Sequence, residues 1–302
     1  MQKSATDIVF GAPAASSGRG DLDTVTAQAW CDLILGRCGL TFRTAQLPDV
    51  IRIVHDQMRR RGIVSETAYY QFLGKPSESA TEWDALIERL LNHETSFFRH
   101  PPSFDALRTH ILPELRDAHQ RGGRLNFWSA GCATGQETYS LAMLAMEDEG
   151  PRVEFTVWGG DISRRAIEIA RRGRYGPRAV ATIPDKYRQR FMRKVGSGSA
   201  AEFEIVDELR QRVRFTATNL VDAASFSPNH DVIFCHNVLI YFSPAAVTQA
   251  VALLASRLTF GGYLLLGPGE APSERPAGLE PVIVNGVRAF QRKSTRPVEV
   301  RE

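Results

Sequence analysis

Residues 129–135 read Ser-Ala-Gly-Cys-Ala-Thr-Gly, and this stretch decides the fold that we expect for the chain. The segment before it, Arg124–Ala130, is apolar and has the length of a strand, whereas Glu137–Met146 has apolar residues at helical spacing. Glycines at 131 and 135 let the backbone turn sharply and approach a ligand closely. The stretch is therefore typical of the ligand-binding turn after the first strand of an α/β sheet.

Strands and helices alternate through the remainder of the chain. The further expected elements are Val153–Gly159, Ser163–Arg171, Asp231–His236, Ala245–Leu258 and Gly262–Gly267. This alternation predicts a mostly parallel, doubly wound sheet with helices on both faces. Asn285-Gly286 suits a type I′ turn, so Pro281–Val284 and Val287–Arg292 are expected to form a terminal antiparallel hairpin.

Residues 184–216 do not follow this alternation of strands and helices. They contain a basic segment, Lys186–Lys194, which we expect to be helical, and two short alternating segments, Glu202–Val206 and Arg212–Thr216. We expect this part to be a small antiparallel β insertion on the main sheet.

Residues 21–91 show a helical pattern and no convincing strand, which predicts a small all-helical domain before the sheet. The expected helices are Val25–Cys38, Leu47–Arg61, Ser65–Leu73 and Thr81–Leu91, with Ser65 and Ser79 offering N-cap hydroxyls and Gly39, Gly62 and Gly74 at helix ends. We assign residues 1–20 to a disordered leader, 92–122 to a linker and connecting helix, 123–293 to the sheet domain and 294–302 to a tail.

The composition excludes several classes of protein. The net charge of +3 over 302 residues does not by itself argue for nucleic-acid binding. No apolar run approaches the roughly 20 residues that span a bilayer, and the first residues have no apolar core of a secretion signal. The four cysteines lack a C-x-x-C pair and the seven histidines lack ligand spacing, so we expect a cytoplasmic protein without a metal.

The expected turn and a carboxylate beyond it favour S-adenosylmethionine as the ligand. Asp161 ends the second strand, where its carboxylate would accept both ribose hydroxyls of an adenosine. A dinucleotide site typically has the motif G-x-G-x-x-G, whereas this chain has Gly131 and Gly135 separated by three residues. Glu137 at the start of the helix would repel pyrophosphate but would attract an ammonium group. No Gly-Lys-Ser/Thr follows, which excludes a P-loop. A tight turn with a surface aspartate, and a site for NAD or another nucleotide, remain open alternatives.

At this point the chain resembles the CheR-type chemotaxis receptor methyltransferases. The resemblance runs in the same order from about residue 50 to residue 290, in the blocks Glu94–Arg99, Trp128–Ser140, Gly160–Ser163, Thr218–Leu220 and Cys235–Phe242. It departs from the usual family pattern at three single positions, since His93 stands for an Asn, Thr138 for a Pro and His236 for an Arg, and also at Gly267–Glu270, which differs from the usual glycine–histidine–serine–glutamate stretch.

The resemblance implies a fold, a reaction and a set of site residues. The fold is a Rossmann-like S-adenosylmethionine methyltransferase sheet with a small antiparallel β insertion, preceded by a small all-helical domain. The reaction forms glutamate methyl esters on a chemoreceptor-type protein and leaves S-adenosylhomocysteine. The cofactor-binding residues would be His93, Thr95, Arg99, Gly131, Glu137, Asp161, Asn219, Leu220, Asn237 and Val238, and the catalytic residues Arg99 and Tyr241.

The partner implied by the resemblance is the cytoplasmic helical domain of a receptor, and we expect the chain to be a monomer. A basic helix carrying Arg52, Arg59 and Arg60 would dock this substrate, although a solvated charged face explains the same pattern. Two rival functions remain open: a nucleic-acid methyltransferase on the same fold, and a non-catalytic adaptor that senses the cofactor. The first is disfavoured because no prolines follow Asn237.

Overall fold

The computed structural model describes residues 25–118, 123–147, 154–198, 201–222 and 229–293. The chain separates after Leu91 into two compact units, and each is considered by itself. The expected leader and tail lie outside the described residues. Within the described residues, no helix combines the length and apolar character needed to cross a membrane.

The first unit consists of helices, as its apolar spacing predicts. They are α1 (Ala27–Cys38), the 3-10 turn η1 (Thr44–Gln46), α2 (Leu47–Arg61), α3 (Glu66–Leu73) and α4 (Pro76–Leu90). Gly39 and Gly62 end α1 and α2 in the left-handed conformation, with φ of 78° and 73°. Ser65 caps α3 by accepting from the backbone N–H of Ala68 at 3.1 Å.

The expected start of the last of these helices was wrong. Helix α4 begins at Pro76 rather than near Thr81, because proline is well suited to the first helical turn. Ser79 therefore lies inside the helix, and its hydroxyl donates back to the carbonyl oxygens of Leu73 and Lys75 instead of capping. Trp30, Tyr69 and Trp83 fill the core of this unit, each at most 2% exposed.

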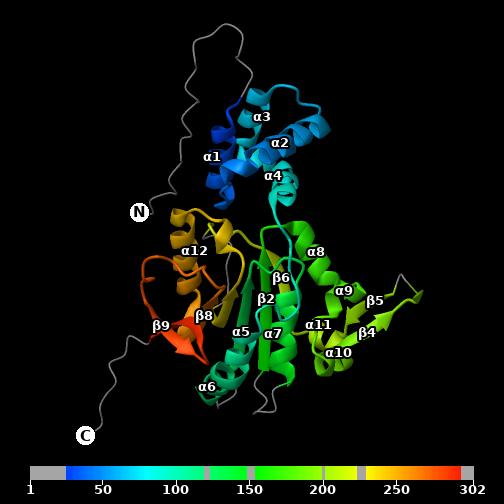
Figure 1. Ribbon diagram of the computed structural model, residues 1–302, viewed down its shortest axis with the longest axis vertical. Helices are drawn as coiled ribbons and strands as arrows, with labels where there is room; N and C mark the ends of the chain where they lie inside the picture. Colours follow the sequence, from blue (N-terminus) through cyan, green and yellow to red (C-terminus); the bar gives the residue numbers. More distant parts are fainter. Residues whose placement is uncertain (1–24, 119–122, 148–153, 199–200, 223–228, 294–302) are drawn as a thin grey trace. The chain divides into compact units, whose positions relative to one another are not determined.

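The second unit is built on a seven-stranded sheet in the order β6-β2-β1-β7-β8-β10-β9 (Figure 1). Its strands are β1 (Arg124–Ala130), β2 (Glu154–Asp161), β6 (Val213–Ala217), β7 (His230–Cys235), β8 (Leu258–Leu266), β9 (Leu279–Val284) and β10 (Val287–Arg292). The pairs β6-β2, β2-β1, β1-β7 and β7-β8 are parallel, and β10 runs antiparallel to both β8 and β9. The doubly wound sheet and its terminal hairpin are confirmed.

Two apolar cores cover the two faces of this sheet. On one face, Leu125 and Phe127 pack with α5 (Pro101–Ala106), the π-helical turn η2 (Leu107–Ile111), α6 (Leu112–Ala118) and α7 (Gln136–Glu147). On the other face, Trp128 and Ala130 pack against α12 (Pro244–Ser256), which Figure 1 shows on the far side from α7. The alternation along β1 thus directs successive side chains into different cores.

A second, three-stranded antiparallel sheet in the order β3-β5-β4 forms the insertion. Its strands are β3 (Arg174–Tyr175), β4 (Met192–Val195) and β5 (Glu202–Ile205), and the neighbouring helices are α8 (Arg164–Arg172), α9 (Pro177–Val180), α10 (Asp185–Phe191) and α11 (Asp207–Arg210). Figure 1 shows it beside the main sheet.

Two details of the expected insertion were wrong. The strand expected at Arg212–Thr216 is β6, which pairs in parallel with β2 at the edge of the main sheet. The expected basic helix ends at Phe191, because Met192–Val195 pairs with β5 as a strand. An alternating pattern predicts that a segment is extended. It does not predict which strand the segment pairs with, because that strand lies elsewhere in the chain.

Candidate functional site

The carboxyl ends of four parallel strands meet along one edge of the main sheet. The segments that leave β1, β2, β6 and β7 there begin at Gly131, Ile162, Thr218 and His236. Ligands of open α/β sheets bind outside these ends, so the predicted cofactor residues are concentrated where a ligand is expected.

The segment after β1 turns tightly over the end of β2. The backbone N–H groups of Gly131 and Cys132 both donate to the carbonyl oxygen of Gly160, at 2.7 and 2.9 Å. Gly131 has φ of +83°, and a Cβ there would lie 2.2 Å from Cγ2 of Val238. The turn accepts only glycine at this position, because both its conformation and its contact with the segment after β7 exclude a side chain.

Asp161 holds this turn from the end of β2 and is only 9% exposed. Its Oδ2 accepts from the backbone N–H of Ala133 at 2.8 Å, and its Oδ1 accepts from that of Ser163 at 2.9 Å. The alternative of a surface aspartate is therefore excluded. Each carboxylate oxygen has two lone pairs, so both oxygens can also accept from a pair of ligand hydroxyls.

Glu137 lies in the first turn of α7 and is held from two sides. Oε1 accepts from the hydroxyl of Ser129 at 2.8 Å, and Oε2 lies 3.1 Å from Nδ1 of His236. The side chain of Glu137 is 13% exposed and that of His236 is 4% exposed. The carboxylate is therefore fixed in orientation at the edge of the sheet, where it can receive a cation.

Glu270, which the sequence did not mark as a site residue, shapes the segment after β7. Its carboxylate accepts three backbone N–H groups, those of Asn237 at 2.6 Å, Val238 at 2.7 Å and Ile240 at 3.3 Å. Asn237 takes a left-handed conformation with φ of +60°, and Glu270 is 4% exposed. A buried carboxylate thus fixes the backbone that carries Asn237 and Val238.

The segment after β6 is tied to the same edge. The backbone N–H of Thr218 donates to the carbonyl oxygen of Asp161 at 2.7 Å. The side chain of Asn219 accepts from the backbone N–H of Val221, and Leu220 is buried in the core that contains Trp128. Asn219 and Leu220 thus follow Asp161 at the neighbouring strand end.

The linker before α5 packs against these segments through two phenylalanines. Phe97 is buried and meets Tyr175 edge-on at 5.0 Å, and the hydroxyl of Tyr175 donates to the carbonyl oxygen of Thr134 in the turn after β1. Phe98 has φ of +51°, and its N–H donates to the hydroxyl of Ser140 on α7. The two rings are packing residues, and they fix the linker on the sheet domain.

The linker and α5 each contact the segment after β7 at one point. Asn92 Nδ2 donates to the hydroxyl of Tyr241 at 3.4 Å, and the hydroxyl of Ser103 lies 3.5 Å from Nε2 of His236. Between them, His93 and Thr95 are half-buried, whereas Arg99 is exposed and its Nη1 donates to the carbonyl oxygen of Glu94 at 2.8 Å. Tyr241 is 37% exposed.

Two thiols at this edge are unsuited to nucleophilic chemistry. Burial raises the pKa values of Cys132 and Cys235 well above the usual thiol value, and Asp161 and Glu270 respectively raise them further. Both therefore remain protonated and serve as small buried groups. Among the described residues, no three His, Cys, Asp or Glu side chains are grouped as metal ligands.

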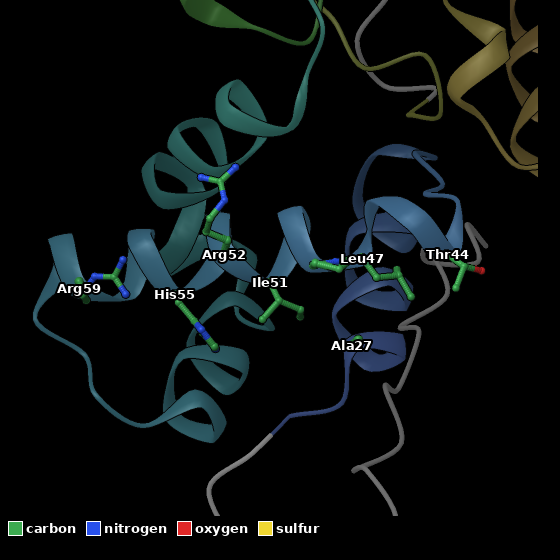
Figure 2. A pocket seen from close by; sticks show the side chains of 8 residues that line it. Ala27, Thr44, Leu47, Ile51, Arg52, His55 and Arg59 are labelled. Atoms are coloured by element: carbon green, nitrogen blue, oxygen red, sulfur yellow. The ribbon is translucent and has the colours of Figure 1, made fainter.

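The basic residues predicted to dock a substrate lie on α2, in the first unit. Arg52 and Arg59 line a groove of about 690 Å³ together with His55, and its apolar part is formed by Ala27, Leu47, Pro48 and Ile51 (Figure 2). Arg52 pairs with Asp49 at 3.0 Å, Arg59 pairs with Asp56, and His55 lies 2.7 Å from Glu66. Arg60 is exposed and does not line the groove.

The known proteins that this chain is similar to are methyltransferases. Residues 93–282 match the family described as CheR methyltransferase, SAM binding domain. A probable chemotaxis protein methyltransferase of Rhizobium etli is 28% identical over 243 residues, which is 80% of this chain and 90% of that protein. The probable biofilm formation methyltransferase WspC of Pseudomonas aeruginosa is 31% identical over 269 residues, 88% of this chain and 61% of that protein. A chemotaxis protein methyltransferase of Vibrio parahaemolyticus is 34% identical over 192 residues, 62% of this chain and 68% of that protein.

Proposed function

Since the chain belongs to the CheR family of S-adenosylmethionine-dependent chemotaxis methyltransferases, we propose that it forms methyl esters on glutamate side chains of a chemoreceptor-type protein in the cytoplasm. The observation that carries this proposal is the joint position of three residues at the carboxyl edge of the sheet. Gly131 provides a turn without a side chain, Asp161 provides an acceptor carboxylate, and Glu137 provides a fixed negative charge.

These residues suit the chemical groups of S-adenosylmethionine. Asp161 would accept the ribose hydroxyls, and Glu137 would receive the ammonium group of the methionine moiety. Asn219 and Leu220 would lie along the adenine, whereas His93, Thr95, Arg99, Asn237 and Val238 would line the remainder of the site. The close approach of Gly131 and Val238 supports this arrangement, because it leaves backbone rather than side chain at the turn.

The proposed reaction does not require the protein to transfer a proton. Bound S-adenosylmethionine supplies a sulfonium methyl group, and a glutamate side chain with an ordinary pKa of about 4.3 is already an anionic nucleophile at neutral pH. No general base is needed. The chain's residues would contribute by aligning the carboxylate and by excluding water from a weak nucleophile.

Arg99 and Tyr241 are the side chains that we propose to stand at the reacting groups. The exposed guanidinium of Arg99 would hold the incoming carboxylate, since Arg binds carboxylates through paired N–H groups. Tyr241 would lie near the transferred methyl, with its hydroxyl held by Asn92. Its exposed fraction of 37% supports access by a large substrate.

The groove on α2 suits an acidic amphipathic helix of the substrate protein. Its apolar part would receive aliphatic side chains, and Arg52 and Arg59 at its rim would pair with acidic side chains (Figure 2). Arg60 follows Arg59 on α2 and is exposed. It would add to the electrostatic attraction without lining the groove.

Incubation with labelled S-adenosylmethionine and cytoplasmic fragments of candidate receptors tests the proposal. We expect label on receptor glutamates, and treatment with alkali should release it because carboxyl esters hydrolyse in base. Alkali-stable label on nucleic acid would favour the rival methyltransferase function. Tight binding of S-adenosylhomocysteine without transfer to any receptor would favour the adaptor.

A charge-reversal pair tests the docking groove in the same assay. R52E/R59E should raise KM for the receptor fragment at least tenfold and leave the affinity for S-adenosylhomocysteine unchanged. K75E is the matched control, because Lys75 is an exposed cation of the same unit that does not line the groove. Equal KM values for the two variants would remove the groove from the proposal.

A further inference from the structure

A second pocket lies at the edge strand β6 of the main sheet and has a volume of about 540 Å³. Arg171 in the last turn of α8 and Arg210 at the end of α11 line it from the helices. Val213, Arg214 and Phe215, the first residues of β6, line it from the sheet. The predicted cofactor residues follow the carboxyl ends of the strands, whereas this pocket contacts the amino-terminal part of β6. It is therefore separate from the cofactor site.

Positive charge exceeds negative charge in the lining of this pocket. Three arginines and the carboxylate of Asp207 line it, which leaves a surplus of two positive charges. Asp207 lies 3.5 Å from Arg210 Nη1, yet its side chain is 74% exposed, so solvent weakens this ion pair. The pocket therefore favours an anionic ligand.

A second acid near Arg210, Glu204, is held by closer partners. Its Oε2 lies 2.7 Å from Arg193 and its Oε1 lies 3.1 Å from Arg174, against 3.8 Å from Arg210. Hydrogen bonds from Arg193 and Arg174 hold the pKa of Glu204 below its usual value, so this carboxylate stays charged at neutral pH. Its single negative charge is shared among three arginines and does not cancel the surplus in the pocket.

Two of the lining arginines are oriented by backbone carbonyl groups rather than by acids. Arg171 Nη2 donates to the carbonyl oxygen of Phe215 at 2.7 Å. Arg214 Nη1 donates to the carbonyl oxygens of Gln211 and Val213, at 2.9 and 2.8 Å. Within the part of the chain that the structure describes, neither arginine forms an ion pair. A guanidinium has five N–H groups, so these bonds leave further donors for a ligand.

We propose that this pocket binds a small molecule that bears a phosphate group. Paired N–H groups of guanidinium match phosphate oxygens, and a phosphate monoester carries about 1.5 to 2 negative charges at neutral pH, which balances the surplus. The half-buried ring of Phe215 offers an apolar surface to the organic part of such a molecule. The volume of the pocket lies within the range of small-ligand sites.

Arg171 and Arg214 also have a structural role, which the test must separate from binding. By donating to carbonyl groups of β6, they cover an edge strand that could otherwise pair with another chain. This role requires a donor but no charge. Glutamine at both positions keeps an amide donor and removes the charge, so R171Q/R214Q removes the anion site and retains the cover of the strand.

Calorimetric titration of the full chain tests the proposal. The protein is first saturated with S-adenosylhomocysteine, so that the cofactor site is occupied and does not bind a nucleotide probe. The probes are inorganic phosphate, uridine monophosphate and uridine. We expect the two phosphates to bind with dissociation constants of about 1 mM or lower, and more weakly as salt is added. Tighter binding of uridine monophosphate would identify an organic phosphate as the ligand, and equal binding would identify the free anion.

R171Q/R214Q should bind uridine monophosphate about tenfold or more weakly, because charged hydrogen bonds are lost, and should keep the wild-type melting temperature. R165Q/R178Q is the matched control, since Arg165 on α8 and Arg178 on α9 are exposed and do not line the pocket. If the double variant melts at a lower temperature, R214Q alone replaces it and R165Q becomes the control.

Three results would overturn the proposal: wild type binds neither phosphate, the variant and its control bind equally, or uridine binds as tightly as its monophosphate. Tighter binding of a glutamate-rich peptide than of uridine monophosphate would also overturn it, in favour of a protein partner.

Discussion

The Cβ that an alanine would place at Gly131 lies 2.2 Å from Cγ2 and 3.2 Å from Cγ1 of Val238, so the turn after β1 and the segment after β7 meet without space between them. Each segment is fixed by its own hydrogen bonds, the first to Gly160 and Asp161 and the second to Glu270. Neither can move aside at low cost. The contact therefore joins two strand ends into one surface.

G131A should weaken the affinity for S-adenosylhomocysteine at least tenfold and lower the melting temperature. Alanine at a φ of +83° costs about 1 kcal/mol or more, and the clash with Val238 must displace one of the two segments. Calorimetry and thermal unfolding measure the two effects. G176A is the control, because Gly176 has φ of −71° and its Cβ would meet nothing within 4 Å. Equal affinities in the two variants would contradict the role of this contact.

E270A should be among the more damaging single substitutions outside the apolar core. Three backbone N–H groups lose their acceptor, and a hydrogen bond to a charged group contributes about 1.5–3 kcal/mol. We expect the free energy of unfolding to fall by about 3 kcal/mol, measured by urea denaturation, with weaker cofactor binding. E274A, an exposed glutamate in the same segment, should leave both unchanged. A small effect of E270A would mean that the segment holds its shape without this carboxylate.

The parts of the site that could be predicted from sequence are local in the chain. Gly131 and Asp161 each follow a strand directly, so strand ends and residue types were enough to place them at one edge. Glu270 and the Glu137–His236 pair were not predicted as a network, because their partners come from segments far apart in the sequence. A residue's chemistry is visible in sequence, whereas its partner depends on the fold.

In the fold as well, local features could be predicted from sequence and long-range pairing could not. Helices α1 to α3 end or begin where glycine and serine predict, because caps act over a few residues. The segment around Arg212–Thr216 was correctly expected to be extended but was assigned to the wrong sheet. Its pairing with β2 depends on a long-range register that alternation does not encode.

R99A should lower the rate of methyl transfer roughly a hundredfold while leaving the protein folded. Arg99 is exposed and donates to the backbone of Glu94 within its own segment, so its removal should change the melting temperature little. Loss of a charged group that holds the reacting carboxylate typically costs about 3 kcal/mol in the barrier, which is roughly a hundredfold in kcat. R108A is the control, because Arg108 is an exposed arginine that pairs with Asp105 on α5. Wild-type turnover in R99A would refute the assignment.

His230 should make the stability of the sheet domain depend on pH. Burial, with a contribution from Arg257, lowers the pKa of His230 to about 4, and its ring packs on Trp128 at 5.2 Å. In an unfolded chain the ordinary value is about 6.5, so between these values the unfolded state binds the extra proton and stability falls as pH falls. The loss should reach about 2 kcal/mol between pH 7 and pH 5, measured by urea denaturation. H230L should lack this part of the pH dependence, and H110L, at an exposed histidine, should keep it. Parallel pH profiles for wild type and H230L would show that His230 does not carry the effect.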